Sequence, residues 1–225
     1  MTTGWRKFLE KLHPQGIPWP GSALYNAISG ARIFQQHYQL VAEDLVQYGP
    51  AKKILDIGTG PGHLLFALGK TFPDAQLTGV DISPAMVEQA RKNRAKHPDS
   101  NIDFQIAGAN DLPFEDETFD IVVSTGSIHH WKNPVPALEE IHRITKPNGY
   151  ALIYDLVSKM PDQVCEDIRT QFGTFRLTLL WLHSFEEPFF DVDEMLALGN
   201  QTKFTNKGVK FIGALCGLVL QKTAE

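Results

Sequence analysis

The stretch Leu55-Asp56-Ile57-Gly58-Thr59-Gly60-Pro61-Gly62 decides the fold of this chain. It joins the apolar run 53–57, which is typical of a buried strand, to residues 63–68, which begin a helix. Its three glycines let the backbone turn sharply and approach a bound nucleoside where any Cβ would collide. A nicotinamide-binding turn has the spacing G-x-G-x-x-G, which is absent here because position 63 is a histidine.

A second strand, residues 76–81, ends in Asp81. An acidic side chain at this place can accept hydrogen bonds from both hydroxyls of a ribose. Ser83 and Pro84 then supply an N-cap and the first residue of a helix. A solvated strand-end carboxylate would explain Asp81 alone, but its position relative to Asp56 and the glycines favours a β-α-β mononucleotide unit.

Further strands are predicted at residues 101–106 and 151–155, and an acidic turn followed by another strand is predicted within 115–124. A turn at 145–150 precedes the last strand. Two segments follow strand ends, where open α/β sheets bind their ligands. They are Gly108-Ala109-Asn110-Asp111-Leu112-Pro113-Phe114 and Thr125-Gly126-Ser127-Ile128-His129-His130-Trp131.

These motifs, in this order over roughly residues 50–155, resemble the class I methyltransferases that use S-adenosylmethionine (SAM), specifically the type 11 (UbiE- and MenG-like) small-molecule family. The resemblance implies an α/β, Rossmann-like fold. Its seven-stranded, mostly parallel sheet would end in a C-terminal antiparallel hairpin, with an N-terminal helical lid. SAM would be the cofactor and S-adenosylhomocysteine the product, and no metal is expected.

The resemblance also implies roles for individual residues. Asp56 would orient the methionine amino group, Gly58, Gly60 and Gly62 would admit the cofactor, and Asp81 would bind its ribose. Asn110 and Asp111 would hold the adenine, with Leu112 as an apolar wall. Further cofactor contacts are expected from Thr59, Ile82, Met86, Ser124, Thr125 and, in the lid, Tyr25.

His129 and His130 are the candidate catalytic bases, because a neutral imidazole near pH 7 can take a proton from an acceptor. The alternative is a shared packing or cofactor-contact role, since such a pair is common in type 11 members that act on different acceptors. Trp131 is expected to pack rather than to stack on a substrate.

One structural domain is expected, with the lid in residues 1–48, the SAM-binding domain in 49–225 and variable acceptor-side helices in 156–205. Helices are predicted at 161–183 and 191–198, and a hairpin at 209–221. The first residues are predicted to form a short amphipathic helix, which would pack on its own domain or on a second subunit in a homodimer, with a membrane surface as the less favoured alternative. The aromatic cluster Phe185, Phe189 and Phe190 is interpreted as core, or as the wall of an apolar acceptor pocket.

Composition limits the partners. A net charge of −5 argues against a nucleic-acid backbone, which needs a clustered cationic face. No apolar run reaches the length of a membrane span, and no signal peptide is recognisable, which favours a cytoplasmic protein. Cys165 and Cys216 lack metal-ligand spacing and are predicted to be buried thiols.

The first functional hypothesis is therefore a SAM-dependent methyltransferase acting on the O, N, C or S atom of a small molecule. Aminopropyl transfer from decarboxylated SAM is less favoured, because the acidic tetrad usual for it after the fourth strand is missing. A SAM-binding subunit without turnover is the third hypothesis, since binding and catalysis use the same residues.

Overall fold

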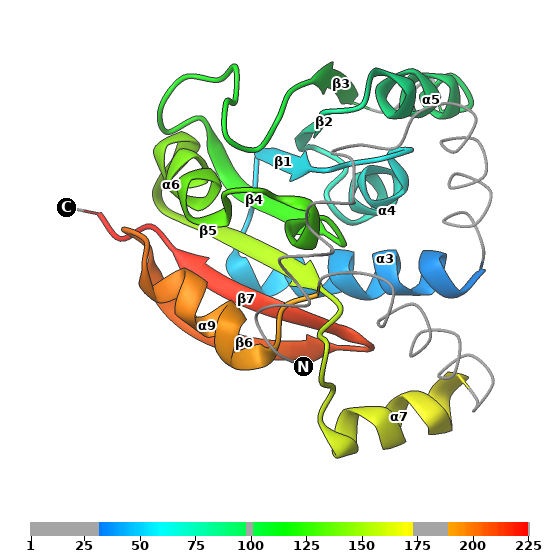
Figure 1. The fold of residues 1–225 in the computed structure, drawn as a ribbon. Coiled ribbons are helices and arrows are strands. Elements are labelled where there is room, and N and C mark those ends of the chain that lie inside the picture. The colour runs from blue at the N-terminus through cyan, green and yellow to red at the C-terminus, as the bar shows by residue number, and fades with distance from the viewer. Residues whose placement is uncertain (1–31, 98–100, 173–188, 225) are drawn as a thin grey trace.

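The computed structural model describes residues 32–97, 101–172 and 189–224. Its centre is a seven-stranded sheet with the order β3-β2-β1-β4-β5-β7-β6 (Figure 1). The strands are β1 (Lys53–Ile57), β2 (Gln76–Asp81), β3 (Ile102–Ile106), β4 (Phe119–Thr125), β5 (Thr145–Asp155), β6 (Thr205–Ile212) and β7 (Leu215–Gln221). The α-helices are α3 (Arg32–Leu45), α4 (His63–Thr71), α5 (Pro84–Arg94), α6 (Pro134–Ile144), α7 (Asp162–Phe172) and α9 (Val192–Asn200). Two short 3-10 helices are η1 (Val46–Tyr48) and η2 (Ile128–His130).

The predicted mostly parallel sheet with a terminal antiparallel hairpin is confirmed. Strands β3, β2, β1, β4 and β5 run parallel to one another. Strand β7 is antiparallel both to β5 and to β6. Because the five parallel strands share one direction, their carboxyl ends meet at one edge of the sheet, and the loops after β1, β2, β4 and β5 can build one site.

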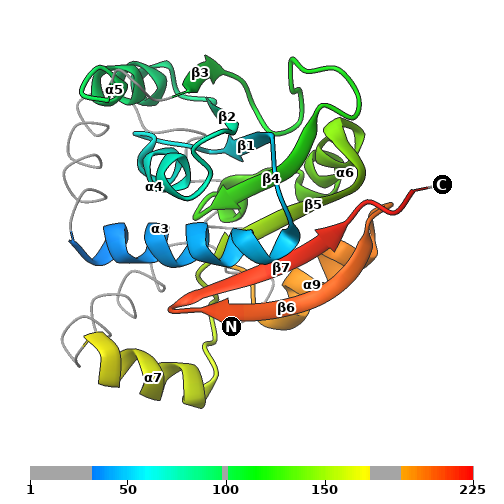
Figure 2. The same ribbon diagram turned by 180° about the vertical axis from the view of Figure 1, so that it is seen from behind.

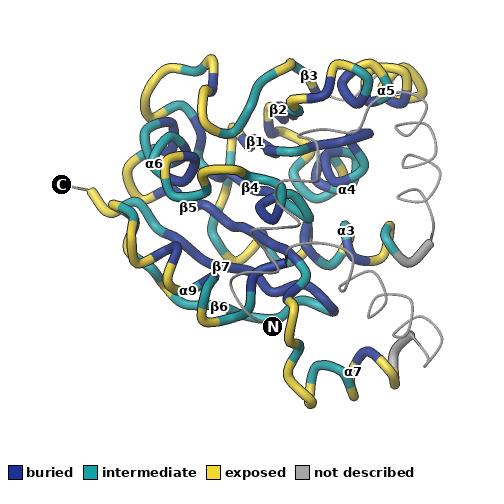
Figure 3. The backbone as a smooth tube through the Cα atoms, viewed as in Figure 1, coloured by how far each residue is buried: buried dark blue, intermediate teal, exposed yellow. Residues whose placement is uncertain are grey.

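Helices cover both faces of the sheet, as Figures 1 and 2 show from opposite sides. On one face, α3, α4 and α5 bury apolar side chains such as Val41, Leu65 and Val87. On the other face, α6 and α9 contribute Ile141 and Met195 to a second cluster. Figure 3 shows that the buried backbone lies along the strands and the inner sides of these helices. The fold is thus a three-layer sandwich whose parallel strands are buried on both faces.

Side-chain caps begin two of the helices. The Ser83 hydroxyl accepts a hydrogen bond from the Met86 N–H at 3.4 Å, and Pro84 follows as the first helical residue, as predicted. At α9, Asp191 accepts from the Glu194 N–H while the Glu194 carboxylate accepts from the Asp191 N–H, a complete capping box. The helix therefore starts where the sequence predicts and continues two residues beyond the predicted end.

Two strand boundaries were predicted incorrectly. The segment predicted as a turn at 145–150 already belongs to β5, because pairing with β4 exists at Thr145 and resumes at Tyr150 after a bulge. Asn148, with φ of 64°, takes up the extra length in a left-handed conformation. Likewise β6 begins at Thr205 rather than 209, because Gly208, with φ of 96°, lies within a bulge that interrupts the strand pattern.

Other predictions have mixed outcomes. Cys216 is buried as predicted, but Cys165 is partly exposed, because it lies on α7, which Figure 1 shows away from the sheet. Phe189 and Phe190 are 4% and 3% exposed, which supports the core interpretation for these two. Phe185, Tyr25 and the first amphipathic helix lie outside the described residues. Within the described ranges, no helix combines the length and apolarity that a membrane span requires.

Helix α3 is fixed to the C-terminal half of the sheet by a partly buried polar cluster. The Asp44 carboxylate accepts hydrogen bonds from the Tyr154 hydroxyl and from Lys210 Nζ, the latter at 2.6 Å. Burial first, and then the Asp44 carboxylate, raise the pKa of the Tyr154 hydroxyl, so the tyrosine stays protonated and donates. The only part of the predicted lid that the structure describes is therefore anchored to β5 and β6.

Candidate active site

The glycine turn between β1 and α4 has a left-handed backbone at all three glycines. The φ angles of Gly58, Gly60 and Gly62 are 72°, 51° and 84°. The N–H groups of Gly58 and Thr59 donate to the Val80 carbonyl at 2.9 and 3.0 Å, which ties the turn to β2. An L side chain rarely adopts such φ values, so the backbone alone requires glycine here.

Two of these glycines are also required by neighbouring side chains. A Cβ on Gly58 would lie 2.5 Å from the Oγ of Ser127, and one on Gly62 would lie 2.6 Å from the Cζ of Phe104. Both distances are too short for carbon contacts, so the protein itself excludes a side chain there. The explanation from the sequence, close approach of a ligand, is therefore incomplete, because these two positions need glycine even without one.

Asp81 connects the turn to the next helix through main-chain hydrogen bonds. One carboxylate oxygen accepts from the Gly60 N–H at 2.9 Å and the other from the Ser83 N–H at 2.8 Å. Burial raises the pKa of Asp81, and the two N–H groups oppose this shift. Each oxygen keeps further lone pairs, so the carboxylate can still accept hydrogen bonds from a ligand hydroxyl.

Asp56, in β1, is the most buried acid of this region, with an exposed fraction of 2%. Burial is the main cause that raises its pKa to about 7, and the nearby Asp81 charge adds to the shift while Thr59 lowers it. A buried carboxyl beside a second acid is well suited to a cationic ligand group, whose charge would favour the ionised form.

The loop after β3 is held by a pair of charged residues on α6 that the sequence did not reveal. The Arg143 guanidinium donates to the carbonyls of Leu112 and Phe114 at 3.1 and 2.8 Å. It also pairs with Asp116 and with Glu140, both at 2.7 Å. The Glu140 carboxylate in turn accepts from the Leu112 N–H at 3.1 Å. Arg143 therefore fixes the backbone of the predicted adenine loop, and its only sequence signal is a charge on the helix before β5.

The three residues predicted for the adenine differ in their surroundings. Asn110 and Asp111 are exposed, and the Asn110 amide donates to the Asn133 carbonyl at 3.0 Å. Leu112 is 3% exposed and belongs to the apolar cluster under α6. Ile82, which follows Asp81, is 45% exposed, an unusual exposure for an isoleucine at a sheet edge. Ile82 and Ile106, which pairs with Asp81 and is 53% exposed, thus offer accessible apolar surface in this region, whereas Leu112 belongs to the core.

Among the remaining predicted cofactor residues that the structure describes, Thr59, Met86 and Ser124 are buried and Thr125 is half-buried. Met86 is 3% exposed and Ser124 fully buried, with its hydroxyl 2.7 Å from that of Ser127. The Thr125 hydroxyl is buried at the end of β4 and has no hydrogen-bond partner among the described residues. A buried oxygen of this kind is expected to find a partner, here a ligand or a water molecule.

His129 forms a buried pair with an acid that the sequence analysis did not single out. Its Nδ1 lies 2.7 Å from Oδ2 of Asp155, the last residue of β5. The His129 N–H also donates to this oxygen at 3.3 Å, and the Leu156 N–H donates to the other oxygen at 2.8 Å. The side chains of His129 and Asp155 are 6% and 2% exposed. The ring centroids of His130 and Phe189 lie 3.9 and 4.3 Å from the ring centroid of His129.

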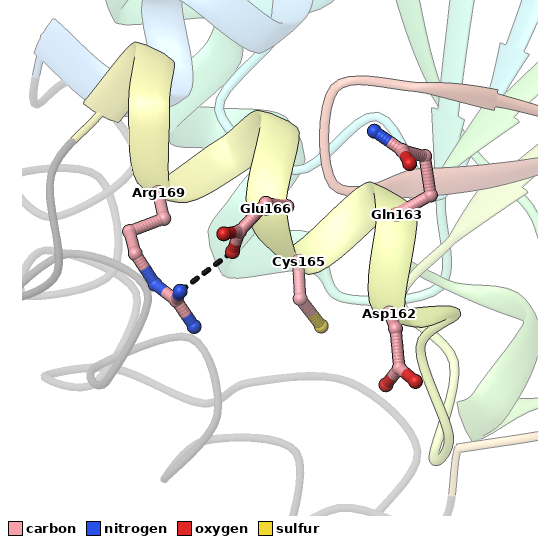
Figure 4. Close-up of a pocket in the computed structure, with 5 residues that line it drawn as sticks. All are labelled: Asp162, Gln163, Cys165, Glu166 and Arg169. Carbon is pink, nitrogen blue, oxygen red and sulfur yellow. Dashed lines mark hydrogen bonds and ion pairs between the residues drawn. The ribbon is translucent and has the colours of Figure 1, made fainter.

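Two hollows lie away from the strand ends. One, of about 360 Å³, runs along α7, where Figure 4 shows Arg169 paired with Glu166 beside Cys165. The other, of about 510 Å³, lies over α6 and includes Asn110 and Arg143. Of all the predicted site residues, only Asn110 lines either hollow.

Comparisons with known proteins agree with this geometry. A family model described as "Methyltransferase domain" matches residues 49–187. The O-methyltransferase cnsE of Penicillium expansum is 34% identical over 169 residues, which is 74% of this chain and 57% of that protein. A demethylmenaquinone methyltransferase of Chlorobaculum parvum is 38% identical over 103 residues, 46% of this chain and 40% of that protein. The chain thus spans less than two thirds of the length of these relatives.

A solved structure has the same fold over nearly the whole chain. It is a putative S-adenosyl-L-methionine-dependent methyltransferase from Methanococcus maripaludis. The TM-score is 0.69 at 22% identity, and the match covers 95% of this chain and 97% of that one.

Proposed function

Because the chain belongs to the family of methyltransferase domains, we propose that it transfers a methyl group from SAM to a small-molecule acceptor. One observation carries the proposal. Asp56, Asp81 and Ile82 follow one another along the ends of two neighbouring parallel strands, next to a glycine turn. Their chemistry matches the amino group, the ribose and the adenine of SAM in that order.

The residues of this chain fit the cofactor. The buried Asp56 carboxyl would gain a cationic partner in the methionine amino group, and Asp81 has lone pairs left for the ribose hydroxyls. The exposed Ile82 would cover one face of the adenine, while Arg143 holds the loop that carries Asn110 and Asp111. When bound, SAM supplies an activated methyl group on its sulfonium, so the protein mainly has to orient the acceptor and exclude water.

The acceptor is the least constrained part of the proposal. The names of the relatives include an O-methyltransferase and a demethylmenaquinone methyltransferase, and the second is named for a small-molecule acceptor. The acidic balance of the chain favours the same class over nucleic acids. No observation favours aminopropyl transfer or a subunit without turnover, so methyl transfer is the function we propose.

Isothermal titration with SAM and with S-adenosylhomocysteine tests the proposal directly. We expect micromolar binding of both ligands, and Asp81→Ala should weaken it tenfold or more, which corresponds to about 1.4 kcal/mol. Asp103→Ala is the matched control, because Asp103 is an exposed carboxylate on the neighbouring strand β3. Folded protein that binds neither ligand would refute the proposed function.

A further inference from the structure

Ser127 connects the end of β1 with the loop after β4. Its hydroxyl donates to the Ile57 carbonyl at 3.3 Å, although the two residues are 70 positions apart in sequence. The Ser124 hydroxyl oxygen lies 2.7 Å from that of Ser127. Because the Ile57 carbonyl can only accept, Ser127 uses its own proton there, and Ser124 is the donor of the second bond. A chain of two hydroxyls therefore runs from β4 to the last residue of β1.

The Ser127 side chain does not make the local contact that is usual at its position. Ser127 precedes η2, and a serine at a helix start commonly accepts a hydrogen bond from a following main-chain N–H. The Ser127 hydroxyl makes no such bond. Main-chain bonds alone close η2, from the His130 N–H to the Ser127 carbonyl and from the Trp131 N–H to the Ile128 carbonyl, both at 3.0 Å. The hydroxyl therefore serves a distant strand instead of its own helix.

The other partner of Ser127 is the glycine turn. A Cβ on Gly58 would lie 2.5 Å from both Cβ and Oγ of Ser127, so the two residues are in close contact. The Ile57 carbonyl and the Gly58 N–H belong to one peptide group. Its N–H donates to the Val80 carbonyl at 2.9 Å, and its carbonyl accepts from Ser127. This single peptide group is thus held by β2 on one side and by the loop after β4 on the other.

A ligand in the glycine turn would act on Ser127 through this shared peptide group. Left-handed glycines have many accessible conformations, and a bound cofactor restricts them. The 3.3 Å bond is longer than the distance of about 2.5–3.0 Å that is usual between two hydrogen-bonded oxygens, so it can shorten when the turn is ordered. Because η2 begins directly after Ser127, a firmer bond at Ser127 should make local opening of η2 rarer.

We propose that Ser127 is a positioning residue, through which SAM bound at the glycine turn orders η2 and the loop after β4. This inference rests on the proposed function, because SAM is the ligand of the turn. The β4–β5 half is the next part of the same strand-end edge, so an acceptor that reaches the methyl group lies against it. Methyl transfer needs the acceptor atom in line with the carbon–sulfur bond, and a loop that is ordered once SAM has bound favours that position.

Hydrogen exchange, measured by mass spectrometry, tests the coupling without any acceptor. The probe is S-adenosylhomocysteine at a concentration that saturates each variant. In the wild type we expect it to slow amide exchange in residues 58–62 and, by about three- to tenfold, in residues 126–131. In Ser127→Ala the slowing in residues 58–62 should remain, whereas in residues 126–131 it should fall below about twofold. A hydroxyl that only stabilised the loop would change exchange equally with and without the ligand, so the ratio of the two rates identifies the coupling.

Two further variants separate the Ser127 hydroxyl from general effects of substitution. Ser127→Thr keeps a hydroxyl and should keep the coupling. Thr71→Val is the matched control, because the Thr71 hydroxyl donates to the Ala67 carbonyl at the same distance of 3.3 Å, at the end of α4 that is far from the glycine turn. Thr71→Val loses a bond of equal length and should leave the exchange ratio in residues 126–131 at its wild-type value. Titration with S-adenosylhomocysteine sets the saturating concentration for each protein.

The outcomes separate this inference from the proposed function. If the ligand binds the wild type but does not slow exchange in residues 126–131, or slows it equally in Ser127→Ala, the inference is overturned. Loss of the slowing in Ser127→Thr or in Thr71→Val would also overturn it, because the Ser127 hydroxyl would then not be the cause. Folded wild-type protein that binds neither SAM nor S-adenosylhomocysteine would instead refute the proposed function.

Discussion

The two halves of the strand-end edge are built in different ways. At β1 and β2, backbone groups form the site, since the glycine turn is left-handed and the Asp81 carboxylate is held by the N–H groups of Gly60 and Ser83. At β4 and β5, a side-chain pair forms it, since His129 is held by Asp155. Substitutions in the first half should therefore damage the fold together with cofactor binding, whereas substitutions in the second half should change chemistry and leave cofactor binding intact.

The largest effect is expected for Gly58→Ala. The left-handed φ of 72° costs about 1–2 kcal/mol for a residue with a Cβ, and the contact of 2.5 Å with Ser127 adds about 1–3 kcal/mol of overpacking. Urea denaturation should show a loss of about 3 kcal/mol in unfolding free energy, with a matching loss of SAM affinity.

Gly126→Ala is the control for this substitution. Gly126 has a similar φ of 65°, but a Cβ there would meet nothing within 4 Å. Gly126→Ala should lower the unfolding free energy only by the cost of the left-handed backbone, about 1–2 kcal/mol. Equal losses in both variants would show that the contact with Ser127 is unimportant and that the first half of the site is less rigid than argued.

Arg143→Gln should have the next largest effect. The guanidinium makes charge-assisted hydrogen bonds to the Leu112 and Phe114 carbonyls, and such bonds contribute about 1.5–3 kcal/mol each before discounting for partial exposure. For Arg143→Gln we expect the unfolding free energy, measured by urea denaturation, to fall by about 2 kcal/mol. SAM affinity, measured by titration, should become three- to tenfold weaker. Arg169→Gln, which breaks an exposed pair with Glu166, should change stability by less than about 0.5 kcal/mol. Unchanged SAM affinity in Arg143→Gln would show that the contacts of α6 with the loop after β3 do not support cofactor binding.

The protonation of Asp56 should make cofactor binding pH-dependent. Its pKa is raised to about 7 chiefly by burial, and the methionine amino group would lower it again. Binding of SAM at pH 6.5 should thus release a fraction of a proton, and near pH 8.5 almost none. Calorimetry in two buffers with different ionisation enthalpies measures the release. Asp56→Asn should abolish it, and a release that persists in this variant would assign the proton to another group.

The same shift predicts the sign of a stability change. A carboxyl whose pKa is raised in the folded protein stabilises it below the unfolded value of about 4. This contribution is lost as pH rises from about 4 to about 7. Relative to Asp56→Asn, the wild type should therefore lose stability as pH rises from about 4 to about 7, and the stability difference should be constant above pH 7. Thermal unfolding of both proteins at several pH values measures this difference.

The smallest effect concerns the two cysteines. Cys216 is fully buried behind Asp155 with its pKa raised to about 11 by burial and the Asp155 charge, whereas Cys165 is partly exposed on α7. A thiol reagent such as 5,5′-dithiobis(2-nitrobenzoate) should label only Cys165 in the native protein, and both cysteines after unfolding. Rapid native labelling that persists in Cys165→Ser would mean that Cys216 becomes accessible because the pairing of β5 and β7 at Asp155 opens.

Local sequence predicted the first half of the site well. The glycine turn, the acid at the end of β2 and the N-cap of α5 lie within about thirty residues, and each is a constraint on consecutive backbone. The incorrect boundaries occur at Asn148 and Gly208, because a bulge lets turn-forming residues remain inside a strand.

The sequence by itself therefore determined the glycine turn and the acids beside it, because short-range backbone requirements specify them. Only the tertiary structure decided that Asp155 lies against His129, 26 residues earlier in the chain, and that Arg143 holds the loop 31 residues before it. The first contact forms because parallel strands bring their carboxyl ends to one edge, and the second because α6 packs against the loop after β3; residue spacing encodes neither contact.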